Sequence, residues 1–114
     1  RPIGTFQVIQ HRLVDMYNAV ETARGMTYYA AAGLATDDIT ARTKIALQAK
    51  VKASQGSKLV GEDSVQIHGG MGYAKEFHVE RYLREALIHR IAPITPHLIL
   101  CYIAERVLGL PKSY

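Results

Sequence analysis

Cysteine is almost absent from this sequence, since Cys101 is the only one among 114 residues. A single cysteine excludes an internal disulfide framework, which fits a reducing compartment: the cytoplasm, or the mitochondrial matrix if the source is eukaryotic. No apolar run approaches the ~20 residues that span a bilayer, so we expect no membrane span, and no secretory signal pattern is present. The chain begins at Arg1 rather than methionine, as expected for a processed or incompletely observed polypeptide.

The sequence also lacks a cluster of charged residues of one sign. The net charge is +4, but the basic residues are scattered. Lys44, Lys50, Lys52 and Lys58 alternate with apolar positions, which is typical of a solvated helix face, and no nucleic-acid-binding motif accompanies them. We therefore expect no nucleic acid partner. Hydrophobic residues make up 48% and charged residues 21% of the chain, as in globular proteins, and its length suits a single domain over residues 1–114.

Apolar residues recur at helical spacing along most of the chain, and no alternating strand pattern of useful length appears. The first apolar stripe is spaced three or four residues apart and consists of Phe6, Ile9, Leu13, Met16, Val20 and Ala23. Similar spacing predicts helices over residues 5–32, 38–68, 76–90 and 96–108. We therefore expect an all-α fold, an antiparallel helical bundle of three to four helices.

The predicted helices differ in the kinds of residue that line their faces. A row of small residues on the second helix would let another backbone approach closely: Ala46, Ala49, Ala53, Gly56 and Val60. On the third helix, Glu80 and Arg84 are four apart, as are Arg81 and Glu85, so each pair can form an ion pair across one turn. The residues expected to face inward on the last helix are Leu100, Ile103, Ala104, Val107 and Leu108.

Helix boundaries are marked by residues with capping chemistry. Asp38 ends an oxygen-rich start signal at residues 36–38, where a side-chain oxygen can accept hydrogen bonds from free backbone N–H groups. Thr95 can cap the last helix in the same way, with Pro96 at the first helical position. Gly109 and Pro111 are expected to end that helix.

The most unusual segment is residues 66–73, which holds three glycines within four positions between two predicted helices. Clustered glycines indicate a backbone that needs positive φ, or one that another group approaches closely. Gln66 and His68 add polar side chains at the same place. One interpretation is a simple helix end followed by a turn, with Gly69 or Gly70 in a left-handed conformation. The other is a ligand-binding turn.

Three segments together resemble one known family. Residues 3–7 (Ile-Gly-Thr-Phe-Gln) look like the end of the "FG-x-x-I-x-x-F-Q" segment of acyl-CoA dehydrogenases. Residues 66–73 resemble that family's "Q-x-x-GG-x-GY" signature, and residues 80–86 resemble its "ER-x-x-RDA" helix. Their order and spacing agree over essentially the whole chain, so the chain resembles the C-terminal helical domain of these enzymes.

The resemblance implies that the chain is the C-terminal part of a larger flavoprotein, which oxidises acyl-CoA to 2,3-enoyl-CoA with FAD. It also implies a dimer or tetramer, in which a neighbouring subunit approaches the glycine segment, and electron-transfer flavoprotein as the electron acceptor. The residues that the resemblance assigns to FAD binding are Gln7, Gln66, Ile67, His68, Gly69, Gly70, Thr95 and His97. A helix C-terminus is electronegative, so polar side chains and turn N–H groups would have to bind the nucleotide's phosphates.

One position departs from the family pattern. Many members carry the catalytic glutamate in an "E-G-T" triplet, which aligns here with Pro93, Ile94 and Thr95. Proline has no carboxylate, so we expect no catalytic residue within this chain. Either the base lies upstream of Arg1, or the chain is a catalytically silent partner subunit or interaction module of the same fold.

Other candidate chemistry is sparse. His89 and His97 are eight residues apart, which is not a metal-ligand spacing, so we expect no metal site. Glu62 and Asp63 could form a catalytic carboxylate pair, although a solvated helix face is the simpler interpretation.

Overall fold

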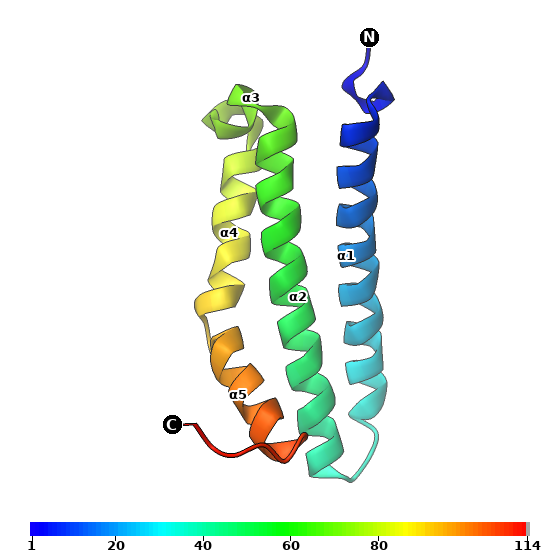
Figure 1. Ribbon diagram of the computed structural model, residues 1–114, viewed down its shortest axis with the longest axis vertical. Helices are drawn as coiled ribbons and strands as arrows, with labels where there is room; N and C mark the ends of the chain where they lie inside the picture. Colours follow the sequence, from blue (N-terminus) through cyan, green and yellow to red (C-terminus); the bar gives the residue numbers. More distant parts are fainter. Residues whose placement is uncertain (114) are drawn as a thin grey trace.

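The computed structural model describes residues 1–113, which form helices joined by short turns (Figure 1). The elements in chain order are η1 (Ile3–Thr5), α1 (Gln7–Gly33), α2 (Ile39–His68), α3 (Gly70–Tyr73), η2 (Lys75–Phe77), α4 (Val79–Ile91) and α5 (Pro96–Arg106). Residues 1–113 contain no strand, so the predicted all-α class is confirmed. Four helices in this range exceed ten residues, in agreement with the predicted bundle of three to four.

The longest helix, α2, lies between the others. It packs against α1 on one side and against α4 and α5 on the other. As Figure 1 shows, α2 runs antiparallel to α1 and to α4, and α5 continues in the direction of α4 beside the first half of α2. The molecule is elongated, with a longest extent of 54 Å.

Local chemistry fixes the predicted helix starts. One carboxylate oxygen of Asp38 accepts hydrogen bonds from the N–H groups of Thr40 (2.9 Å) and Ala41 (3.1 Å). The Thr95 hydroxyl oxygen accepts one from the Leu98 N–H at 3.4 Å, and Pro96 follows as the first residue of α5. Both predicted caps are therefore confirmed, and α1 and α2 begin and end within two residues of their predicted bounds.

Small residues of α2 allow the neighbouring helices to pack closely against it. A Cβ atom added at Gly56 would lie 3.3 Å from the backbone oxygen of Ala19 on α1. A Cβ added at Gly61 would lie 2.9 Å from the end of the Leu83 side chain on α4. The distance at Gly56, which belongs to the predicted row of small residues, confirms that a neighbouring helix approaches that face closely. Gly61 lies outside that row and meets α4.

Three details of the predicted helices are wrong. The third helix begins at Val79 rather than Glu76, because residues 75–77 form a 3-10 turn and His78 adopts a left-handed conformation with φ 59°. The last helix, α5, ends at Arg106 rather than Leu108, so Leu108 lies beyond the helix and is 66% exposed although it was expected to face inward. Leu100 was also expected to face inward but is 46% exposed, whereas Ile99 is 1% exposed. Leu100 is exposed because α5 packs mainly against α2, so α2 covers only one narrow face of α5.

Although no membrane span was expected from the sequence, one stretch of the described residues is long and apolar enough to cross a membrane. It is Val79–Arg106, whose most apolar 18-residue window has a mean hydropathy of 1.3. The stretch is divided, however, because residues 92–95 separate the 13 residues of α4 from the 11 residues of α5. Each helix is shorter than the ~20 residues that a membrane span requires.

Much of the apolar surface of this chain is uncovered. The buried residues among 1–113 are Val51, Ser54, Gly56, Gly72, Pro96 and Ile99. An apolar groove of about 570 Å³ lies across α1, α2 and α4, and its lining includes Val20, Val60 and Tyr82. An apolar surface of this extent is typical of an interface with another protein part.

Candidate functional site

The glycine segment and Gln7 lie at the same end of the molecule. Because α1 and α2 are antiparallel, the start of α1 meets the end of α2 there (Figure 1). The Arg12 guanidinium donates a hydrogen bond to the Asp63 carboxylate and fixes this register. Gln7 lies little more than one turn before Arg12, and Gln66 lies one turn after Asp63. The structure therefore brings together two predicted parts of the site that are 59 positions apart in sequence.

The three glycines of the segment serve different needs. Gly69 ends α2 with φ 59° and ψ −139°, a backbone conformation that is essentially restricted to glycine. A Cβ added at Gly72 would lie 2.6 Å from the backbone oxygen of Val65, so Gly72 lets the short α3 pack against α2. A Cβ added at Gly69 or Gly70 would meet no atom within 4 Å. These two glycines thus present open backbone, while Gly72 is structural.

Polar side chains lie at the same end of the molecule as this open backbone (Figure 1). Gln7 and Gln66 are exposed, and their side chains make no hydrogen bond within residues 1–113. The His68 ring lies with Nδ1 2.7 Å from the carbonyl oxygen of Ser64. Because a carbonyl oxygen can only accept, Nδ1 is the donor in this contact. Ile67 is half-buried, so it contributes packing and backbone rather than a polar group.

Thr95 and His97 lie apart from this group, at the junction between α4 and α5. Both residues are exposed. The Thr95 oxygen accepts the capping hydrogen bond, so its hydroxyl proton is available to another acceptor. The junction is held against Ser54 of α2, whose hydroxyl donates to the carbonyl oxygen of His89 at 3.0 Å. Ser54 precedes Gln66 by 12 positions, or about 18 Å of helix, so the predicted residues form two separate groups.

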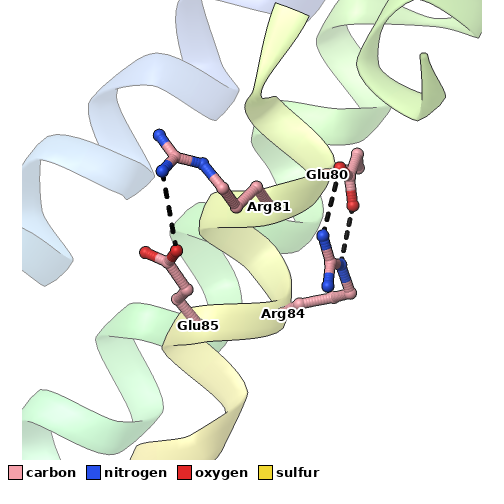
Figure 2. Close-up of polar contacts among 4 residues, drawn as sticks. All are labelled: Glu80, Arg81, Arg84 and Glu85. Atoms are coloured by element: carbon pink, nitrogen blue, oxygen red, sulfur yellow. Dashed lines mark hydrogen bonds and ion pairs between the residues drawn. The ribbon is translucent and has the colours of Figure 1, made fainter. Parts of the chain in front are cut away.

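Two ion pairs stabilise α4 on different sides of the helix (Figure 2). The Arg84 guanidinium donates to the Glu80 carboxylate at 2.7 and 3.3 Å. This hydrogen bond lowers the pKa of Glu80 and raises the pKa of Arg84, so both groups stay charged near neutral pH. Arg81 and Glu85 form the second pair at 3.8 Å. Both pairs predicted from the four-residue spacing are confirmed.

The two carboxylates that could form a catalytic pair, Glu62 and Asp63, have basic partners, as does Glu105 on α5. Glu62 pairs with Lys58 at 3.2 Å, and Asp63 accepts from Arg12. Glu105 pairs with Arg106 at 3.1 Å. These contacts agree with structural roles. Among residues 1–113, no three His, Cys, Asp or Glu side chains are placed to hold a metal ion.

Lys50 is a residue whose role the sequence analysis missed. It was expected on a solvated face, but its ammonium group donates to the backbone oxygens of His89 and Ala92. The signal that could have revealed it is the pair Pro93 and Pro96, which removes backbone donors from the junction. The contact itself joins residues about 40 positions apart, which periodicity does not encode.

The chain is similar in sequence to known proteins of one family. A sequence profile described as "Acyl-CoA dehydrogenase, C-terminal domain" matches residues 1–108. The chain is 36% identical over 113 residues to acyl-CoA dehydrogenase FadE12 of Mycobacterium tuberculosis, covering 99% of this chain and 29% of that protein. It is 38% identical over 113 residues to the mitochondrial short-chain specific acyl-CoA dehydrogenase of Bos taurus, covering 99% of this chain and 26% of the relative.

A third relative is the mitochondrial isobutyryl-CoA dehydrogenase of Dictyostelium discoideum, 41% identical over 91 residues, with 80% of this chain and 22% of that protein covered. The chain therefore spans less than a third of the length of these curated relatives. No solved structure matches it significantly.

Proposed function

This chain belongs to the acyl-CoA dehydrogenase C-terminal domain family, and we propose that it is the FAD-contacting, oligomerising domain of an enzyme that oxidises acyl-CoA to 2,3-enoyl-CoA. FAD, when bound, supplies the redox chemistry by accepting a hydride from the acyl chain. In this proposal the domain itself holds and orients the cofactor. Electrons leave through an electron-transfer flavoprotein.

The observation that carries the proposal is the open backbone at Gly69 and Gly70. No atom of residues 1–113 would lie within 4 Å of a side chain at either position, although Gly69 adopts a conformation that costs other residues energy. Gln66 lies three residues before Gly69, Gln7 lies at the same end of the molecule, and neither amide makes a hydrogen bond within residues 1–113. These groups fit a nucleotide, since amides can both donate to and accept from its oxygens and nitrogens.

The separation of the two predicted groups supports a site shared between subunits. One FAD would contact Thr95 and His97 of one protomer and residues 66–70 of its neighbour. The apolar groove of about 570 Å³ and the uncovered apolar surface of α4 and α5 support an assembled protein, in which other protein surfaces cover them. We propose that the full-length protein is a dimer or tetramer.

The base that removes the α-proton of acyl-CoA is proposed to come from outside this chain. Pro93 occupies the position where many family members carry a glutamate, and its ring cannot accept a proton. The acidic residues nearest this position in sequence, Glu85 and Glu105, are engaged by Arg81 and Arg106. The same proline favours a second candidate function, in which the chain keeps the fold and contacts an active partner without dehydrogenating acyl-CoA itself.

One experiment tests the proposal and separates it from this alternative. Full-length protein containing FAD is mixed with an acyl-CoA in deuterated buffer, and mass spectrometry follows both α-proton exchange and 2,3-enoyl-CoA. We expect both in the wild type and in Glu85→Gln and Glu105→Gln, whereas neutralising the upstream base should abolish them. Loss of exchange in Glu85→Gln or Glu105→Gln alone would show that the base lies in this chain. FAD binding without exchange or product would favour the silent partner.

A further inference from the structure

The junction between α4 and α5 contains two carbonyl groups that the helical backbone cannot satisfy. In an α-helix, a carbonyl oxygen accepts from the N–H group four residues later. For His89 that residue is Pro93, which has no N–H group. Ala92 follows the last residue of α4 in an extended conformation, so its oxygen has no helical donor either. Both oxygens therefore need donors from elsewhere.

Helix α2 supplies these donors. The ammonium group of Lys50 donates to the oxygen of His89 and, at 3.0 Å, to that of Ala92. The hydroxyl group of Ser54 donates to the oxygen of His89 at 3.0 Å. A positive charge here also complements the negative C-terminal end of α4. We call this arrangement of Lys50 and Ser54 the junction clamp.

The clamp lies in the best-covered part of the chain. Ser54 is fully buried, and the four buried residues in this region are Val51, Ser54, Pro96 and Ile99. Val51 is next to Lys50 in sequence, and Ile99 is on the first turn of α5, three residues after Pro96. Packing and hydrogen bonds thus fix the same short segment, residues 92–96. Thr95 is inside it and remains exposed.

We propose that Lys50 and Ser54 are positioning residues that hold the Thr95 hydroxyl group where it contacts FAD. This inference rests on the proposed function of the domain. The clamp supplies donors to two carbonyl oxygens that the backbone leaves without one, and it ties the segment before Thr95 to α2. Lys50 and Ser54 act through Thr95 and have no contact of their own with the cofactor.

A double-mutant cycle on full-length protein tests this role. The dissociation constant for FAD is measured for wild type, Lys50→Met, Thr95→Val and the double variant, together with melting temperatures without FAD. Lys50→Met is expected to weaken FAD binding about tenfold, the scale of one hydrogen bond to a charged group. If Lys50 acts through Thr95, the double variant should bind FAD no more weakly than Thr95→Val alone.

Controls separate positioning from folding. Lys52→Met removes an exposed lysine two positions away and should leave FAD binding unchanged, whereas Lys50→Arg should recover part of the loss. If Lys50→Met does not fold, Ser54→Ala takes its place in the same cycle, because this change removes only the hydroxyl oxygen that donates to His89.

Full additivity in the cycle, or a lower melting temperature with unchanged FAD affinity, would overturn the positioning role alone. Wild-type protein that does not bind FAD would overturn the proposed function and this inference with it.

Discussion

Replacement of Gly72 by alanine should destabilise the protein, because the structure leaves no room for a side chain there. A Cβ at this position would lie 2.6 Å from the backbone oxygen and 2.9 Å from the Cα of Val65, and 3.0 Å from the Cβ of His68. The first two atoms are backbone of α2 and cannot rotate away. The short α3 would have to move away from the end of α2.

The cost can be estimated from overpacking in other proteins, where one extra methyl group in a filled space costs about 1–3 kcal/mol. The matched control is Gly70→Ala, two positions earlier, where no atom lies within 4 Å of an added Cβ and φ is not positive. This control should change the free energy of unfolding by about 0.5 kcal/mol or less.

The assay is denaturant unfolding of full-length protein without FAD, followed by circular dichroism. We expect Gly72→Ala to shift the midpoint of the transition to lower denaturant concentration, while Gly70→Ala stays near the wild type. Equal midpoints for Gly72→Ala and Gly70→Ala would refute the reasoning, because α3 would then not be packed on Val65.

Two further predictions concern a helix cap and an ion pair. Asp38→Ala removes the acceptor of two backbone hydrogen bonds and should cost about 0.5–2 kcal/mol by thermal unfolding, whereas Asp37→Ala beside it should cost much less. Glu80→Gln should lower the melting temperature slightly at neutral pH. Because Arg84 lowers the folded-state pKa of Glu80, the stabilising contribution is complete above the ordinary value of 4.5 and is lost as pH falls through the lowered pKa. Melting curves of the wild type and Glu80→Gln should therefore converge in acid, and a constant difference across pH would contradict this.

The parts of the fold that follow from nearby residues could be predicted from the sequence. Asp38 and Thr95 cap helices through hydrogen bonds to residues two or three positions away. Gly69 ends α2 because it tolerates a positive φ. These features depend on a few consecutive residues, so spacing and side-chain chemistry are sufficient to locate them.

Contacts between distant segments could not be predicted in the same way. Lys50 resembles its neighbouring lysines in sequence, and only the position of α4 shows that it meets two free carbonyl groups. Likewise, Ile99 and Leu100 are equally apolar, and which one is buried depends on the side from which α2 approaches α5. His78 adopts a left-handed conformation without being glycine, so the short turns before α4 were also missed.

The same distinction between local features and distant contacts holds for the candidate site. The sequence left open whether Gly69 and Gly70 form a helix end or a ligand-binding turn, and it grouped Gly72 with them although Gly72 has a packing role. The sequence also did not separate Thr95 from Gln66 in space, because the distance depends on where the α4–α5 junction meets α2.

The most direct test of the central claim is FAD retention by full-length Gly70→Val. A Cβ added at Gly70 or at Gly25 on α1 has no non-neighbouring atom of residues 1–113 within 4 Å, so the melting temperature without FAD should change little in Gly70→Val, as in the control Gly25→Val. If the backbone at Gly70 contacts FAD, the dissociation constant for FAD should rise at least tenfold in Gly70→Val and remain unchanged in Gly25→Val. A Gly70→Val protein that binds FAD as tightly as the wild type would contradict the claim.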